Sequence, residues 1–409
     1  MKNRLNLMCH LQSLPSCAIL ATGRTGSDFL QSLFDSHPEV LTFNGPLFFH
    51  DFWAQSKCVH PNAGQSIDYR DSNKFDLSDF LDEFIGFHIE KFKSKYDLQE
   101  RKNEMGLERN ESIDIDTHLF KNHSLNILNG IELNSKNIML AVYGSYAMCL
   151  NQNVFKKNIL LHHIHVVSKL SSYLKDFPNS KILHTTRDPR ANYVSSVNHW
   201  AQYKPDTNIH RLSLKALHKI QRDVIAKNKF IYNEHAAIRL EDLGNEGILR
   251  KLADWLGLNY HETMKVSTFG GLLWHGDRLS TGKKTSLGFS HAMINNGWQQ
   301  ILSKRDKYIL NYLMNDRLVG CCYPNNNIRF IDNIFVPILI LFPMSLERKY
   351  WSIKYMIKTI HKRGLLRFFH RYYIYIYSHF QRVLLFINLY LNVLKKERFP
   401  ITVITNHYT

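Results

Sequence analysis

Long apolar stretches are missing from this sequence of 409 residues. No run of about 18 uncharged apolar residues occurs, so we expect no transmembrane helix. Residues 1–16 lack an apolar segment followed by a small-residue cleavage site, so we expect no signal peptide. The six cysteines form no CxxC pair and no metal-ligand spacing, which predicts free thiols, a reducing compartment and no metal site.

Acidic residues are also scarce, with 35 Asp and Glu against 52 Lys and Arg, so the formal net charge is +17. The excess is unevenly placed, because residues 345–409 contain 12 basic and only two acidic side chains. Hydrophobic residues make up 44% of the chain and aromatic residues 12%, which excludes a wholly disordered protein.

Strand-like and helix-like segments alternate along the chain. Residues 17–22, 181–186 and 236–240 are short apolar runs typical of buried strands. After the second run, Asp188 is a good helix N-cap and Pro189 suits the first helical position. The alternation predicts an α/β fold, a P-loop-like three-layer domain with a mostly parallel sheet and helices on both faces.

Other segments give further expectations. Residues 136–144 are a candidate strand, 77–92 a candidate helix, and 247–256 a short helix ended by Gly257. Leu214, Leu217, Val224 and Ile231 suggest a helix after the one that begins at Pro189. Residues 55–135 are polar and mixed, with 93–117 charged and loop-rich, and we interpret them as an insertion that carries an acceptor site.

The first candidate site is the sequence GRTGS, residues 23–27, between the first strand and the first helix of the alternation. Backbone N–H groups at such a helix N-terminus bind phosphate or another oxyanion. A nucleotidase P-loop would carry a lysine after Gly26, but Ser27 follows here, which disfavours ATP and magnesium chemistry. An ordinary strand-to-helix turn is the alternative.

The second candidate site combines Arg187 and Ser195. Arg187 follows a strand at the edge where α/β sheets bind ligands, and Ser195 lies about two helical turns beyond Asp188. The pair suits a second phosphate. Alternatively, Arg187 pairs with a local carboxylate and Ser195 is a surface hydroxyl.

Taken together, GRTGS and the later RDPRANYVS resemble the sulfotransferase family that uses 3′-phosphoadenosine 5′-phosphosulfate (PAPS). The segments SHPEV (36–40) and FPNSKILHTTRDPR (177–190) look like its carbohydrate-type branch. The resemblance covers about residues 15–325. It implies that the phosphosulfate is bound by Arg24, Thr25, Gly26, Ser27 and Asp28, and the 3′-phosphate by Arg187 and Ser195.

The sequence departs from this branch at Gly45, which stands where the branch often has a catalytic glutamate. Other branches use a histidine on the segment before the second motif. Here His163 and His165 are alternate residues that share a face if the chain is extended, and either is a candidate base. Asp51 is a weaker candidate, and the alternative is that the histidines are structural.

The resemblance implies transfer of a sulfuryl group from PAPS to a hydroxyl of a glycan or glycolipid. Arg24 would neutralise charge on the leaving 5′-phosphate, and a histidine would take the proton of the acceptor. One alternative is a membrane-tethered protein that binds nucleotide without catalysis, which the missing glutamate would favour. A P-loop kinase is another alternative.

The C-terminal segment, residues 326–409, follows the predicted PAPS-binding domain (1–325) and is basic, aromatic and predicted to be helical. Residues 334–341 are apolar but broken by Pro337, and 372–394 are the most membrane-like stretch. The pattern suits an interfacial segment on an anionic membrane surface, at the inner face of a bacterial membrane for a cytoplasmic enzyme. The alternative is a helical hairpin packed on the domain. No nucleic-acid motif is recognised, so no nucleic-acid partner is expected.

Overall fold

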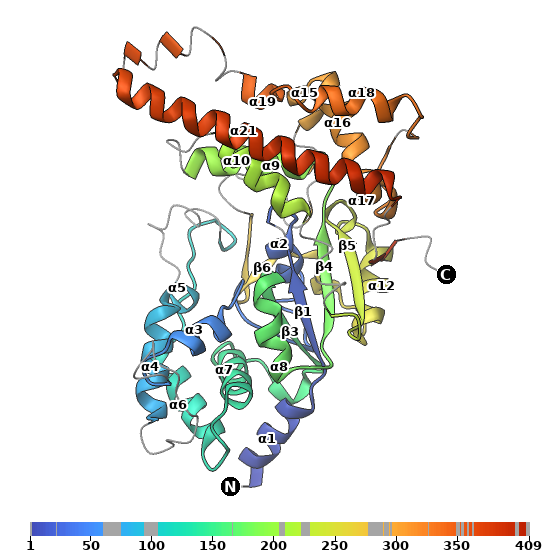
Figure 1. Cartoon of the computed structure of the whole chain (residues 1–409). Helices are drawn as coiled ribbons and strands as arrows, with labels where there is room; N and C mark the ends of the chain where they lie inside the picture. Colours follow the sequence, from blue (N-terminus) through green and yellow to red (C-terminus); the bar gives the residue numbers. More distant parts are fainter. Residues whose placement is uncertain are drawn as a thin grey trace.

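The computed structural model places a parallel sheet at the centre of the chain (Figure 1). It describes residues 2–409 except 22, 60–74, 94–104, 166, 204–208, 222–229, 277–288, 290–293, 295–296, 326, 349–351, 353–355, 358–359, 362–363, 397–400 and 406–409. The sheet has six strands in the order β2-β3-β1-β4-β5-β8, and every pairing is parallel. In chain order the strands are β1 (Ser16–Leu20), β2 (Val40–Thr42), β3 (Ile159–His165), β4 (Lys181–Thr186), β5 (His235–Arg239) and β8 (Thr402–Val403).

Helices cover both faces of the sheet, which confirms the predicted three-layer α/β fold. Ala18 and Leu20 of β1 face a core shared with α1 (Lys2–Ser13), α7 (Ser135–Cys149) and α8 (Leu170–Asp176). Cys17 and Ile19 face the opposite core, with α2 (Ser27–Ser32) and α12 (Glu246–Leu256). The strict alternation along β1 explains why a fully buried strand has no polar face.

The predicted strand at residues 136–144 is wrong, because these residues form the middle of helix α7. Asn134 caps the helix by accepting a hydrogen bond from the backbone of Asn137. All residues from 137 to 147 are buried. A helix covered on every side has no polar face, so its sequence cannot be distinguished from a buried strand by periodicity.

The insertion between β2 and β3 is mainly helical (Figure 1). The predicted helix at 77–92 is confirmed as two pieces, α4 (Leu77–Phe87) and α5 (Ile89–Phe92). The other helices of the insertion are α3 (Phe49–Gln55) and α6 (Thr117–Leu128). Aromatic side chains of α3, α4 and α5 pack on α7, so the insertion continues the core on that side of the sheet.

A further helical layer lies beyond the carboxyl ends of the strands (Figure 1). It contains α9 (Pro189–Tyr203), α10 (Ile209–Gln221), α15 (Trp298–Ile301), α16 (Lys304–Leu313), α17 (Asn315–Gly320), α18 (Asp332–Leu339), α19 (Ser345–Arg348) and α21 (Leu365–Leu394). A short hairpin, β6 (Thr268–Phe269) and β7 (Leu272–Leu273), lies between α12 and α15 in the sequence. The predicted helix through Leu214 and Leu217 is confirmed as α10. Val224 lies outside the described residues, and Ile231 is in a turn.

The C-terminal segment is helical, as predicted, but it also returns to the sheet. Ala236 and Ala237 of β5 pair with Thr402 and Val403 of β8. This strand was not anticipated, because a strand of two residues carries too little sequence pattern to be recognised. No helix within the described part of the chain combines the length and apolar character that crossing a bilayer requires.

Candidate active site

The loop that joins β1 to α2 has an unusual backbone. Gly23 and Gly26 have φ angles of 86° and 83°, and Arg24 between them has 58°. Where residues in the left-handed backbone conformation alternate with residues in the right-handed one, successive backbone N–H groups point to the same side. This is the geometry of an anion-binding loop. Gly26 is also the N-cap of α2, so the positive end of that helix faces the same region.

Two contacts hold this loop against the neighbouring elements. A Cβ atom on Gly26 would lie 2.3 Å from Cδ1 of Leu240, so only glycine fits at this position. The hydroxyl of Thr25 lies 2.7 Å from the hydroxyl of Thr185 near the end of β4. Ser27 is buried at the first turn of α2. The loop is therefore fastened to its neighbours directly after Arg24.

The second motif lies against the first, as the sequence predicted. Arg187, at the carboxyl end of β4, donates a hydrogen bond of 3.2 Å to the carbonyl oxygen of Arg24. Nε of Arg24 lies 3.5 Å from Oγ of Ser195 on α9. Burial lowers the pKa of Arg187, with the repulsion of Arg24 as a smaller contribution. Two guanidinium groups near each other suit a ligand with two anionic centres.

A carboxylate frame orients the start of α9. Asp188 accepts a hydrogen bond of 2.9 Å from the backbone N–H of Arg190, which confirms the predicted N-cap. Its carboxylate also forms an ion pair of 2.6 Å with the guanidinium of Arg190. Glu241 accepts from the backbone of Asp188 and from the hydroxyl of Tyr323. Burial raises the pKa of Glu241. These bonds fix the start of α9 relative to β4, and so they orient the side chains of Arg187 and Ser195.

The two candidate histidines lie side by side at the carboxyl end of β3. Nδ1 of His163 lies 2.9 Å from Oε1 of Gln31, and Nε2 of His163 lies 3.4 Å from Nδ1 of His165. His163 is fully buried, whereas His165 is partly exposed and has a φ of 70°. The pairing with β1 shifts register between Ile19 and Leu20, which is where His165 is displaced from the regular strand.

The hydrogen bonds of Gln31 determine which nitrogen of each ring carries the proton. Its Nε2 donates to the carbonyl oxygens of Phe43 and Gly45, which can only accept, so Oε1 is the atom that faces His163. Nδ1 of His163 therefore carries the hydrogen, and burial keeps the ring neutral by lowering its pKa. Its Nε2 then accepts from Nδ1 of His165, which leaves the lone pair of His165 on Nε2.

Gly45 has a structural reason to be glycine. Its φ is 70°, a left-handed conformation that strains a glutamate. Its carbonyl oxygen accepts a hydrogen bond of 3.3 Å from Gln31. The position where the carbohydrate-type branch often has a glutamate is thus part of the support of His163 in this chain.

Asn44 was missed by the sequence analysis. It is fully buried after β2, and neither Oδ1 nor Nδ2 has a hydrogen-bond partner among the described residues. A buried amide without partners costs free energy, and native proteins rarely keep one without a use. The only sequence feature that pointed to Asn44 was its position directly before Gly45. Asp51, the weaker candidate, forms an ion pair with Lys169 on the insertion side.

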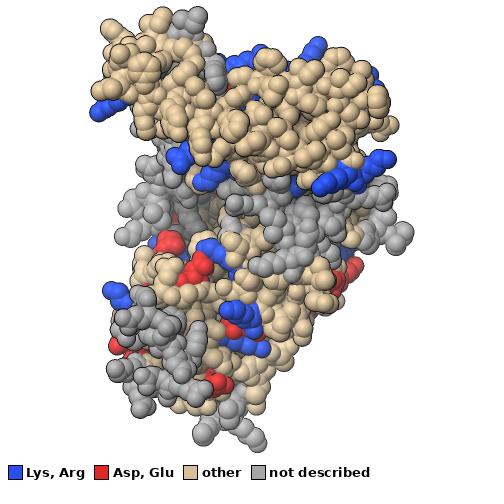
Figure 2. Space-filling view, viewed as in Figure 1, with Lys and Arg blue, Asp and Glu red and all other residues tan. Residues whose placement is uncertain are grey.

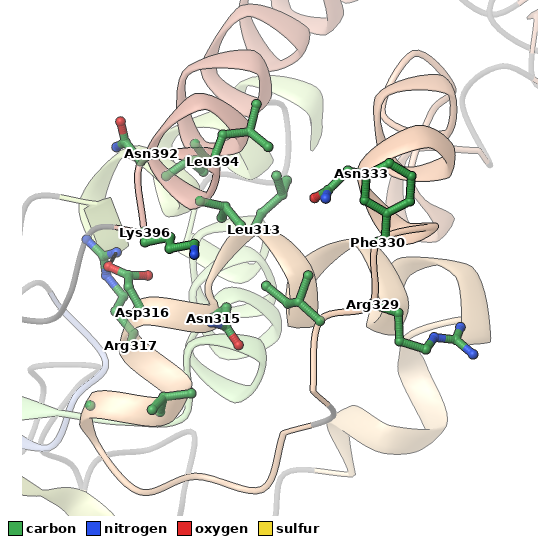
Figure 3. Close-up of a pocket in the computed structure, with 15 residues that line it drawn as sticks. Leu313, Asn315, Asp316, Arg317, Arg329, Phe330, Asn333, Asn392, Leu394 and Lys396 are labelled. Carbon is green, nitrogen blue, oxygen red and sulfur yellow. Dashed lines mark hydrogen bonds and ion pairs between the residues drawn. The ribbon is translucent and has the colours of Figure 1, made fainter.

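Two further observations concern metal binding and the position of a cavity. Within the described residues no group of three or more His, Cys, Asp or Glu side chains is arranged to hold a metal ion. A cavity of about 680 Å³ lies away from both motifs, between α17, α18 and α21 (Figure 3). Its lining includes Leu313, Asn315 and Lys396, and none of the motif residues.

Comparison with solved structures finds sulfotransferases of low similarity. The sulfotransferase domain of the olefin synthase of Synechococcus PCC 7002 has 14% identity and a TM-score of 0.41, over 71% of this chain and 90% of that one. The sulfotransferase domain from the curacin biosynthetic pathway has 13% identity and a TM-score of 0.33, over 62% and 77% of the chains. Sulfotransferase STF9 from Mycobacterium avium has 14% identity and a TM-score of 0.31, over 64% and 71%.

No curated protein sequence matches the chain. In contrast, the profile of the sulfotransferase family matches residues 15–262, which is more than half of the sequence. The match spans both motifs and the strands that position them. The chain belongs to the sulfotransferase family.

Proposed function

We propose that the protein transfers a sulfuryl group from PAPS to a hydroxyl of a glycan or glycolipid acceptor. The observation that carries this proposal is the meeting of Arg24, Arg187 and Ser195 beside a loop of left-handed residues. PAPS has two anionic centres, the phosphosulfate and the 3′-phosphate. A loop of N–H groups and a separate pair of an arginine and a serine match those two centres in kind and number.

In this proposal the donor binds along the carboxyl edge of β1 and β4. The backbone of residues 23–28 and the side chain of Ser27 hold the phosphosulfate, and Thr25 holds the loop to the sheet. Arg24 neutralises the charge that develops on the leaving 5′-phosphate oxygen. Arg187 and Ser195 bind the 3′-phosphate, which selects PAPS over ATP.

His165 is the proposed base, and His163 and Gln31 are positioning residues. The ring of His165 is partly exposed, whereas His163 is fully buried and cannot reach an acceptor from outside. The acceptor oxygen forms a bond to sulfur as the bond from sulfur to the 5′-phosphate oxygen breaks. His165 takes the hydroxyl proton, and 3′,5′-ADP leaves with the bonding electrons.

In this proposal a hydroxyl of the acceptor forms a hydrogen bond with the buried amide of Asn44, which has no partner among the described residues. A glycolipid acceptor would place the enzyme at a membrane surface. The C-terminal segment has the basic and apolar side chains that such a location needs.

The test is incubation of the purified protein with PAPS labelled in the sulfuryl group, together with bacterial envelope lipids or soluble glycans. We expect label in an organic-phase or glycan product, and loss of that label in Arg24→Ala. Binding of 3′,5′-ADP without any transfer would favour the alternative of a non-catalytic nucleotide-binding protein. Transfer from γ-labelled ATP would favour a kinase.

A further inference from the structure

Helix α21 has an apolar stripe that faces away from the rest of the protein. Its exposed large side chains follow one another every three or four residues, which places them on one face of the helix. They are Leu366, Phe369, Tyr373, Ile376, Phe380, Leu384, Ile387, Leu391 and Leu394. The opposite side of the helix packs on α10 and α16 through Leu385, Phe386 and Leu389. Helix α21 is therefore apolar on two sides, and only one of them is used by the fold.

Helix α18 extends this apolar stripe into a broader surface. The hydroxyl of Tyr390 donates to the carbonyl oxygen of Asn333, and a ring nitrogen of His379 lies 3.0 Å from the carbonyl oxygen of Leu341. The two helices therefore run antiparallel along each other. Helix α18 and the residues around it add exposed apolar side chains, namely Phe330, Ile331, Ile334, Phe335, Ile338, Leu341 and Phe342. We call the exposed apolar side chains of the two helices the α18–α21 surface.

The charges on the segment that contains α21 have one sign. No acidic residue occurs between Arg348 and Lys396, whereas eleven basic residues do, if both ends are counted. Figure 2 shows the helical layer as mostly uncharged, with Lys and Arg at its margins. Two copies that met through this surface would bring basic margins together. An anionic lipid surface instead complements both the apolar centre and the basic margin.

The α18–α21 surface is rigidly mounted on the protein. Arg382 of α21 forms an ion pair of 3.2 Å with Glu347 of α19, and both side chains are fully buried. The guanidinium also donates to the carbonyl oxygens of Ile340 and Phe342. After α21, the chain returns to the sheet as β8. The buried ion pair and the pairing of β8 therefore fix α21 to the domain with its apolar stripe exposed.

The cavity of about 680 Å³ lies next to the α18–α21 surface (Figure 3). Leu389, Val393 and Ile328 give it apolar walls, and Lys396 extends toward it from the end of α21. The lining also contains Arg329 and Arg317, the latter paired with Asp316, so the cavity combines apolar walls with several basic groups. This combination suits an acyl chain next to an anionic headgroup.

We infer that the α18–α21 surface docks the protein on an anionic lipid bilayer, with the adjoining cavity open to one of its lipids. Val194 and Val197 of α9, the helix that carries Ser195, belong to the same hydrophobic cluster as Leu385 and Phe386 of α21, and α10 contacts both helices. The docked bilayer thus lies on the far side of the same helical layer that closes the nucleotide site. This inference concerns binding and does not depend on the sulfuryl transfer proposed above.

The test is flotation of the full-length protein with vesicles of phosphatidylcholine, with or without phosphatidylglycerol. We expect binding only to the anionic vesicles. Replacing Ile338, Phe380 and Leu384 by serine should weaken that binding by about tenfold or more, because three apolar side chains no longer enter the lipid. The matched control is Leu119→Ser, Leu133→Ser and Phe155→Ser, three exposed apolar residues outside the surface, which should bind like the wild type.

Charge reversal gives a second arm. Arg367→Glu with Lys395→Glu should weaken binding to the anionic vesicles by roughly tenfold. An unchanged circular-dichroism spectrum and an unchanged thermal midpoint will show that each variant is folded. The inference is overturned if the wild type stays unbound, or if the triple serine variant floats as well as its control. It is also overturned if light scattering shows a wild-type dimer that the triple variant loses, because a second copy then covers the surface.

Discussion

Oε1 of Gln31 lies 2.9 Å from Nδ1 of His163, and this contact sets the proton positions of two histidines. Gln31→Leu removes the acceptor and lets both rings change tautomer. We expect kcat to fall about tenfold, which corresponds to one lost hydrogen bond of ~1.4 kcal/mol. The Kd for 3′,5′-ADP, measured by calorimetry, should stay the same. A Gln31→Leu enzyme with full kcat would contradict the positioning role.

Replacing His165 by alanine should reduce kcat by about 10²–10⁴-fold, the usual contribution of a general base. The affinity for 3′,5′-ADP should not change, because the ring does not hold the donor in this proposal. His163→Asn should have a smaller effect on kcat than His165→Ala. If the His163 variant is the slower of the two, His163 is the base, and if both keep full rate, the base lies elsewhere.

Arg187→Ala should abolish binding of 3′,5′-ADP and leave the fold intact. The more specific measurement compares PAPS with adenosine 5′-phosphosulfate, which lacks the 3′-phosphate. The variant should lose the preference for PAPS, and Ser195→Ala should weaken PAPS binding about tenfold, by the loss of one hydrogen bond to a charged group. Arg250→Ala, on the surface of α12, is the control and should bind like the wild type. Unchanged nucleotide affinity in Arg187→Ala would exclude the 3′-phosphate assignment.

Asn44→Leu should raise stability while it lowers activity. The change removes a buried amide that has no partner among the described residues, so the free energy of unfolding should rise by about 1 kcal/mol. The KM for the acceptor should rise, because the proposed hydrogen bond to it is gone. Urea denaturation and acceptor titration measure the two effects. A variant that loses stability and keeps its acceptor KM would show that Asn44 is structural.

Stability should depend on pH through buried neutral histidines. Burial lowers the pKa of His162 and of His163 well below the ordinary value, so each binds a proton below about pH 6.5 only in the unfolded chain. The contribution of these two histidines to the free energy of unfolding is therefore fully present above that pH and decreases as the pH falls. The expected slope is up to ~1.4 kcal/mol per pH unit for each histidine, measured by urea denaturation between about pH 7 and 5. His162→Phe should reduce the slope by the contribution of one histidine, up to ~1.4 kcal/mol per pH unit. An unchanged slope would contradict this assignment.

Some features were readable from local sequence. The GRTGS loop and the Asp188-Pro189 helix start depend on φ preferences and capping, which act over a few residues, and both were predicted correctly. The alternation of apolar runs and amphipathic helices likewise predicted the parallel three-layer fold. Residues 136–144 were misassigned because a helix buried on all sides has no periodic polar face, so only its neighbours distinguish it from a strand.

Other features depend on residues far apart in the sequence. The different surroundings of His163 and His165 depend on burial, on a register shift in β3 and on the amide of Gln31 on another element. The reason for a glycine at position 45 is its left-handed φ, together with the hydrogen bond that its carbonyl oxygen accepts from Gln31. The sequence alone determined the motifs and the charge of the tail, because these are local properties. Only the tertiary structure decided which histidine nitrogens carry protons and which side of α21 remains exposed, because proton positions and exposure depend on the contacts that distant segments make.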